Sequence, residues 1–199
     1  MTRTKSAWIA LAGAGGMLGS APASAAVAQG SGFLQGFTHP VVGLDHALAI
    51  IAVGIIAGLI GGRALWLVPA AFVACMAAGA LWGIRRIDLP YFEIGIAASV
   101  VVFGAVMAFG RRLPIAAAAA LAGVFAVFHG YAHGTEAPLE VSVAGYFVGF
   151  LLAAAVLMAI GIGIEAAIAR LGEPNANRTR QVAGAAIALA GVGFLAGWL

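Results

Sequence analysis

The chain's four histidines fall in two short stretches, and each stretch also carries carboxylates. These residues are His39, Asp45 and His46 in the first stretch, and His129, His133 and Glu136 in the second. Imidazole and carboxylate ligands together suit borderline divalent metals such as Ni²⁺, Co²⁺, Zn²⁺ and Cu²⁺, and the lack of thiolates disfavours a Cu(I) site. The pattern therefore predicts a divalent metal site, on the condition that the two stretches meet in the fold.

The spacing within each stretch fits one face of a helix. His129 and His133 are four residues apart and Glu136 follows three residues later, so a helix presents all three on one side. His39 and His46 are seven residues apart, which on a continuous helix is two turns, or about 10.5 Å along the axis. A single histidine near a helix end is most often an interfacial residue, whereas four histidines beside acids favour a metal site.

The composition indicates that these stretches belong to a membrane protein. Hydrophobic residues make up 63% of the 199 residues and charged residues only 9%, whereas soluble domains carry about 25% charged residues. So few charges cannot cover the surface of a water-soluble protein of this length. The net charge of +3 needs no nucleic-acid partner, because excess Arg and Lys usually lie in cytoplasmic loops and no basic run with interleaved aromatics is present.

Residues 1–25 have the features of a cleavable secretory signal peptide. The start is positively charged through Arg3 and Lys5, an apolar segment covers residues 7–18, and a small-x-small pattern ends at Ala25. The apolar segment is shorter than the ~20 residues that a spanning helix needs, although an uncleaved first helix is the alternative. Cleavage after Ala25 would place the mature N-terminus in the periplasm.

The sequence of residues 26–199 predicts one transporter domain. We expect it to be an all-α integral membrane bundle of six membrane-spanning helices. Each apolar run has about 20 residues, enough to cross about 30 Å of hydrocarbon. The expected spans are 38 or 41 to 60, 64–83, 89–109, 113–134, 141–164 and 181–198. Pro40 is expected in the first turn of the first span, where its missing N–H costs nothing. Residues 165–180 are expected to form the one sizeable polar loop.

Arginines indicate the orientation of this bundle. With the mature N-terminus outside, the loops after the first, third and fifth spans are cytoplasmic and carry most of the arginines, as the positive-inside rule requires. They are Arg63, Arg111, Arg112, Arg170, Arg178 and Arg180, against Arg85 and Arg86 outside. Both histidine stretches then lie in one outward-facing layer, and Glu93, near the start of the third span, lies in it too. Glu93 could equally sit at the interface or cap its helix.

The motif His-Pro-x-x-Gly-x-Asp-His over 39–46, together with His-Gly-x-x-His-Gly-x-Glu over 129–136, resembles the HupE/UreJ family of nickel and cobalt permeases. The resemblance covers the signal peptide, the six spans and both motifs. It implies secondary transport of Ni²⁺, sometimes Co²⁺, into bacteria that load hydrogenase or urease. Position by position, it implies that the metal-binding residues are His39, Asp45, His46, Glu93, His129, His133 and Glu136.

We therefore expect a transporter, not an enzyme, in the bacterial inner membrane, with Ni²⁺ or Co²⁺ as the transported ion and no further cofactor. Its partners are the metal ion and the lipid bilayer, and its oligomeric state stays open. Two other classes also stay open: a metal-binding accessory or sensor protein without transport, and a metal-dependent membrane hydrolase. Against the hydrolase, the chain has no HExxH motif and no general base beyond the ligands.

Overall fold

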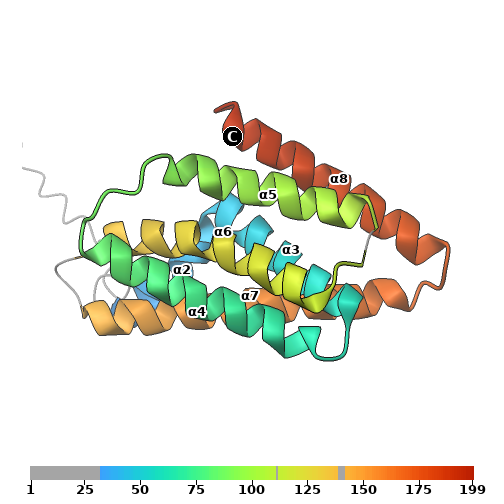
Figure 1. Ribbon diagram of the computed structural model, residues 1–199, viewed down its shortest axis with the longest axis horizontal. Coiled ribbons are helices and arrows are strands. Elements are labelled where there is room, and N and C mark those ends of the chain that lie inside the picture. Colours follow the sequence, from blue (N-terminus) through green and yellow to red (C-terminus); the bar gives the residue numbers. More distant parts are fainter. Residues whose placement is uncertain (1–31, 111, 139–141) are drawn as a thin grey trace, which may run out of the picture.

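The computed structural model describes residues 32–110, 112–138 and 142–199. The predicted signal peptide lies outside the described residues, as do Arg111 and Glu140. Within the described ranges the fold is an elongated all-α bundle without strands (Figure 1). Its helices are α2 (Gly32–Val42), α3 (Leu44–Ile60), α4 (Ala64–Ile84), α5 (Phe92–Ala108), α6 (Ile115–Thr135), α7 (Val143–Ala169) and α8 (Asn175–Leu195).

Several of these helices are long and apolar enough to cross a bilayer. α4, α6 and α7 each qualify by length and composition, and α2 with α3 makes a fourth span if the bent pair is counted as one. α5 is apolar but has only 17 residues, and the first turns of α8 are polar. The chain is a multi-pass membrane protein, and the count of six spans stays a prediction.

The first span is not the continuous helix that the spacing suggested. α2 and α3 meet at an 81° bend, where Gly43 has an extended backbone with φ −73° and ψ 104°. Pro40 lies inside α2, near its end, and not in a first turn. Proline has no N–H to continue the hydrogen bonds of a helix, and glycine is a poor helix former. The helix is therefore interrupted here, where Pro40 and Gly43 lie three residues apart. His39 and His46 therefore lie on different helices.

Small residues bring the helices into close contact. α4 lies along α6, α2 and α3 lie along α7, and α5 lies along α8. A Cβ atom on Gly130 or Gly134 of α6 would overlap the backbone of α4 at Met76 or Ala80. Such approaches are how helices associate where lipid offers no hydrophobic drive.

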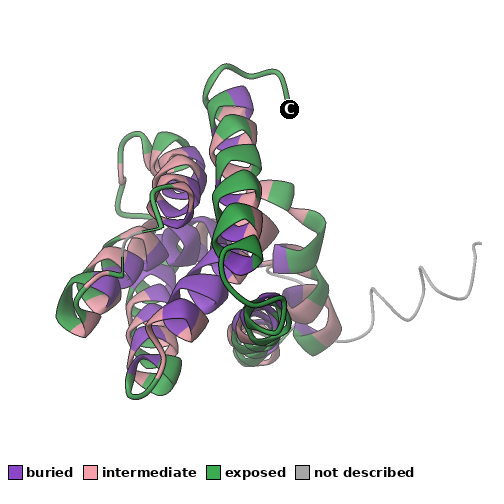
Figure 2. Ribbon diagram, turned by 90° about the vertical axis from the view of Figure 1, so that its right-hand side faces the viewer, coloured by how far each residue is buried: buried purple, intermediate pink, exposed green. Residues whose placement is uncertain are grey.

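α3 is the central helix of the bundle. It contacts all six other described helices, and nine of its residues are buried. Buried residues gather in the middle of the bundle and exposed ones around its outside (Figure 2). α7, by contrast, exposes an apolar stripe at four-residue intervals, which is the pattern of a helix face turned to lipid. The stripe consists of Leu152, Val156, Ile160 and Ile164.

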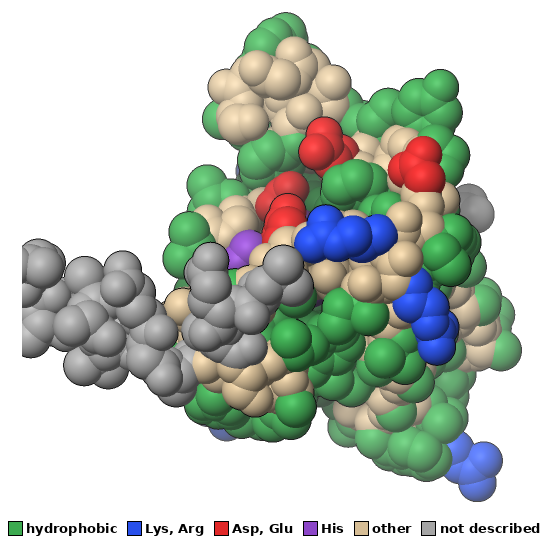
Figure 3. Space-filling model, turned by 90° about the vertical axis from the view of Figure 1, so that its left-hand side faces the viewer, with side chains coloured by type: hydrophobic (Ala, Val, Ile, Leu, Met, Phe, Trp, Pro, Cys, Tyr) green, Lys and Arg blue, Asp and Glu red, His purple; other side chains and the backbone are tan. Residues whose placement is uncertain are grey.

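One end of the bundle carries most of the groups singled out by their chemistry. The end of α6 lies there together with the starts of α5 and α7 (Figure 1). On this face, acidic side chains gather beside a histidine (Figure 3). The connections that carry Arg63, Arg112 and Arg170 lie at the opposite end (Figure 1).

The prediction of a sizeable polar loop over residues 165–180 is wrong. α7 continues to Ala169 and α8 begins at Asn175, so only residues 170–174 lie between them. Glu165 and Arg180 are 4% and 5% exposed. The Arg180 guanidinium donates to both carboxylate oxygens of Glu165, with Nη2 2.6 Å from Oε1. Because the two charges compensate each other, both helices can carry them into the packed interior.

Candidate metal centre

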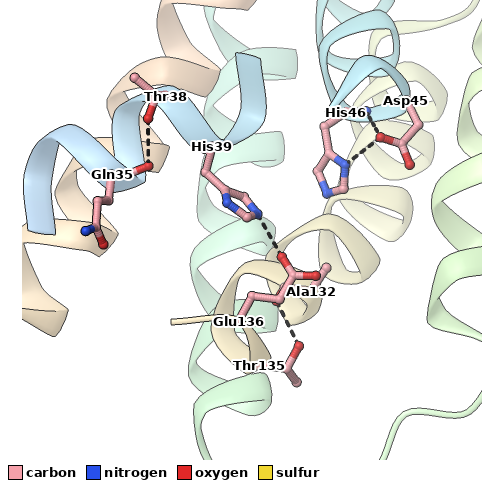
Figure 4. A network of polar contacts seen from close by, with 8 residues as sticks. All are labelled: Gln35, Thr38, His39, Asp45, His46, Ala132, Thr135 and Glu136. Atoms are coloured by element: carbon pink, nitrogen blue, oxygen red, sulfur yellow. Dashed lines mark hydrogen bonds and ion pairs between the residues drawn. The ribbon is translucent and has the colours of Figure 1, made fainter. Parts of the chain in front are cut away.

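The break between α2 and α3 brings the first histidine stretch to the site from two directions. His39 lies in the last turn of α2, whereas Asp45 and His46 lie in the first turn of α3 (Figure 4). Asp45 Oδ1 accepts a hydrogen bond from the backbone N–H of His46 at 2.8 Å, and lies 3.0 Å from its Nδ1. Because a carboxylate can only accept, Nδ1 of His46 carries the proton and Nε2 keeps its lone pair.

The second stretch occupies the last turns of α6 and is buried. His129 and His133 are both 0% exposed, and their four-residue spacing places them on one face of the helix. Gly130 and Gly134 lie about 100° further round and contact α4 so closely that a Cβ would overlap its backbone. The glycines thus let α4 close one side of the site while the imidazoles face the start of α3.

The structure brings the two stretches together as one line of imidazoles. Ring centroids lie 4.9 Å apart for His39 and His133, 4.8 Å for His133 and His46, and 4.6 Å for His46 and His129. At one end of the line the side chain of His39 is 38% exposed. At the other end His129 is fully buried. The line therefore leads from the solvent-facing surface into the bundle.

Ser99 of α5 holds His129, and the sequence analysis missed it. Its Oγ lies 2.6 Å from the carbonyl oxygen of Ile96 and 2.9 Å from Nε2 of His129. The carbonyl can only accept, so the hydroxyl donates there and accepts from Nε2–H, which leaves the lone pair of His129 on Nδ1. A sequence signal was available, because Ser99 is the sole polar side chain between Glu93 and Arg111.

Buried ring nitrogens without hydrogen-bond partners gather along this line. Among the described residues they are Nε2 of His46, Nδ1 of His129 and both nitrogens of His133. An unpaired buried polar atom costs roughly 1–3 kcal/mol. Neutral imidazole nitrogens are also the commonest metal ligands in proteins. These unpaired nitrogens, on rings that lie next to one another, are therefore candidate ligands for a cation.

The outer end of the line supplies a second group of ligands. One ligand atom each from His39, His133 and Glu136 lies within 4.8 Å of the others. His39 Nε2 is 2.7 Å from Glu136 Oε2 (Figure 4), and the side chain of Glu136 is 50% exposed. A cavity of about 330 Å³ is lined by His39, Glu136 and Tyr146. A hydrated cation can therefore reach this group from outside.

Tyr146 of α7 is a further neighbour that the sequence analysis did not single out. Its ring centroid is 6.0 Å from that of His39, and its hydroxyl is buried without a hydrogen-bond partner among the described residues. Tyr131, which lies between the two buried histidines in sequence, points elsewhere: its hydroxyl accepts from the backbone N–H of Leu89 at 3.1 Å. Tyr131 thus holds the connection between α4 and α5 in place and makes no hydrogen bond to the imidazoles.

Glu93 stands apart from the imidazoles. It lies in the first turn of α5 and lines a cavity of about 290 Å³ together with Asp45, His46 and Glu136. Glu93 thus shares this cavity with residues of both histidine stretches. Asp45 and Glu136 line the same cavity, and three carboxylates around one cavity favour cations there. Figure 3 shows acidic side chains on this face, with basic side chains beside them.

Comparisons with known proteins point to one family. Residues 11–194 match the protein family described as HupE / UreJ protein. Over 166 residues the chain is 45% identical to Protein HupE of Rhizobium leguminosarum bv. viciae, and the match covers 83% of this chain and 85% of that protein. No solved structure matches the chain.

Proposed function

Because the chain belongs to the HupE/UreJ family, we propose that it is a secondary transporter of Ni²⁺, with Co²⁺ as a second transported ion. In this proposal the metal is cargo and not a cofactor, and the protein is not an enzyme. The observation that supports it best is the convergence of four imidazoles with Asp45 and Glu136 at one end of an apolar helical bundle.

The ligand types fit a transported borderline dication. Imidazole nitrogens and carboxylate oxygens suit Ni²⁺ and Co²⁺, and the site offers no thiolate that would select a softer ion. Glu136 carries the one carboxylate within the outer ligand group, so the dication keeps part of its charge uncompensated. A transport site must bind its ion firmly enough for capture yet weakly enough for release.

The distribution of charge supports uptake from the periplasm across the bacterial inner membrane. Arg63, Arg112 and Arg170 lie at the end of the bundle opposite the imidazoles, and cytoplasmic loops are the ones enriched in arginine. The ligands would then face the periplasm, as would the mature N-terminus. In this arrangement α2 with α3 forms one broken span, and five further spans follow. An inside-negative potential favours inward movement by about 2.3 kcal/mol per charge per 100 mV.

Uptake of radioactive Ni²⁺ into proteoliposomes tests this proposal. The wild-type protein should accumulate Ni²⁺ when the vesicle interior is negative, and His46→Ala should lose this uptake. Leu152→Ala, which changes the exposed apolar face of α7, serves as the control and should behave as wild type. Metal binding without accumulation would contradict transport and favour an accessory protein or sensor. Wild-type uptake by His46→Ala would contradict the site.

A further inference from the structure

The line of imidazoles contains two groups of ligands that share His133. The outer group is His39, His133 and Glu136, whose ligand atoms lie within 4.8 Å of one another. The deeper group is His46, His129 and His133, with ring centroids 4.6 and 4.8 Å from that of His46. The outer group is open to solvent through His39 and Glu136. In the deeper group the His46 side chain is only 11% exposed and His129 is fully buried.

Two members of the deeper group are each held in one tautomer. Asp45 accepts from Nδ1–H of His46, and Ser99 accepts from Nε2–H of His129. The remaining nitrogen of each ring carries a lone pair and is buried without a hydrogen-bond partner among the described residues. Metal-binding histidines are held in this way, with one nitrogen on a hydrogen-bond acceptor and the other on the ion.

His133 differs because neither of its nitrogens is held. Both are buried and lack hydrogen-bond partners within the described chain. Its ring stacks on Phe150 at a centroid distance of 4.9 Å and an interplanar angle of 20°, which sets the plane of the ring but not its tautomer. A neutral imidazole has a single lone pair. His133 can therefore bind an ion in the outer group or in the deeper group, but not in both at once.

We infer that the site holds one divalent ion at a time in two consecutive positions, and that His133 passes the ion from the outer position to the deeper one. This inference rests on the proposed function, since it describes the first step of the ion's path. Ser99 is a positioning residue here, because it keeps Nδ1 of His129 free for the ion without touching it. In the deeper position His46 and His129 replace His39 and Glu136, so the ion loses its one carboxylate ligand, which favours onward release.

Co²⁺ absorption spectroscopy on the purified full-length protein in lipid nanodiscs distinguishes the two positions. The d–d bands of Co²⁺ report its ligand set and geometry, which differ between the two groups. We expect one Co²⁺ per chain in the wild type. Glu136→Gln should still bind one Co²⁺, with the spectrum of the deeper position. His129→Gln should also bind one Co²⁺, with a different spectrum that belongs to the outer position.

Ser99 is tested in the Glu136→Gln background, where the deeper position is the one occupied. Ser99→Ala should weaken Co²⁺ binding there about 10–100-fold, the usual effect of losing the partner that orients a metal-binding histidine. Ser99→Thr keeps the hydroxyl and should restore binding. If Ser99→Ala lowered thermal stability but left Co²⁺ affinity and spectrum unchanged, the positioning role would be overturned.

Two further results would overturn the two-position scheme. One is simultaneous binding of two Co²⁺ per chain, because the scheme gives a neutral His133 one lone pair, which serves one ion at a time. The other is loss of all binding in Glu136→Gln or in His129→Gln while circular dichroism shows the helices intact, which indicates a single site. Either result is compatible with Ni²⁺ uptake by the wild type in proteoliposomes. Failure of the proposed function itself is distinct, because the wild type would then accumulate no Ni²⁺.

Discussion

Nε2 of His39 lies 2.7 Å from Oε2 of Glu136, and this contact joins α2 to the end of α6 across 97 residues of sequence. Both side chains are more than one third exposed, at 38% and 50%. An ion arriving from solvent therefore meets this pair before it reaches the buried rings. Substitutions in this pair should therefore affect capture of the ion more than its later movement through the protein.

Glu136→Gln should lower Ni²⁺ uptake at limiting concentrations by about tenfold or more, which corresponds to at least ~1.4 kcal/mol of lost capture free energy. The loss removes both a ligand and the negative charge that attracts the cation, so the half-saturating concentration should rise more than the maximal rate falls. Initial uptake rates over a range of Ni²⁺ concentrations measure this. Asp88→Asn, an exposed acid of the α4–α5 connection, is the matched control, and equal effects of the two substitutions would contradict the assignment.

Gly130→Ala should destabilise the bundle by about 1–3 kcal/mol, because the added Cβ overlaps the backbone of Met76 and the two helices must separate. Since His129 and His133 lie on the same helix turns, metal binding should weaken as well. Gly163→Ala is the control, because a Cβ there meets nothing within 4 Å. Thermal unfolding in detergent compares the two, and a stable Gly130→Ala protein would show that α4 and α6 are not in this contact.

Arg180→Gln should cost about 3–5 kcal/mol of folding free energy, because it leaves the buried Glu165 carboxylate without its counter-charge. Arg178→Gln, on the exposed side of the same helix, should change stability by less than about 0.5 kcal/mol. Adding Glu165→Gln to Arg180→Gln should recover part of the loss, since the uncompensated charge is then gone. Unfolding measurements on the four proteins test the pair, and equal stability of Arg178→Gln and Arg180→Gln would contradict it.

Single cysteines in a Cys75→Ser background should report the orientation. A membrane-impermeant maleimide added to spheroplasts should label Asp88→Cys, which lies at the imidazole end of the bundle. Asn175→Cys, at the start of α8, should be labelled only after the membrane is permeabilised. Labelling in the reverse order would place the ligands on the cytoplasmic side and would turn the proposed uptake into export.

The sequence predicted well those parts of the fold that depend on local pattern. His129 and His133 share a face because the apolar run of α6 continues through them, so the i, i+4 spacing applies directly. The first stretch is different, because Pro40 is compatible both with the first turn of a helix and with a helix that ends soon after it. Spacing alone did not show that the helix breaks at Gly43 and resumes at Leu44. The expected order and direction of the spans placed both histidine stretches at the same end of the bundle, so their proximity could be predicted.

Other features depend on long-range contacts that spacing cannot reveal. Ser99 was passed over because a lone serine in an apolar span is ordinary, and its role follows only from its place beside His129. The sequence predicts Glu165 and Arg180 in a loop because each charge alone is costly to bury. Side by side they compensate each other, and α7 and α8 extend through them.

X-ray absorption spectroscopy at the Ni K-edge on the purified, Ni²⁺-loaded protein tests most directly whether the clustered histidines bind the ion. We expect a shell of nitrogen and oxygen ligands with the multiple-scattering signal of at least two imidazoles and no sulfur. His133→Ala should reduce the imidazole signal, because that residue belongs to both ligand groups. An all-oxygen shell, or an unchanged imidazole signal in His133→Ala, would show that the histidines of α2, α3 and α6 do not bind the ion together.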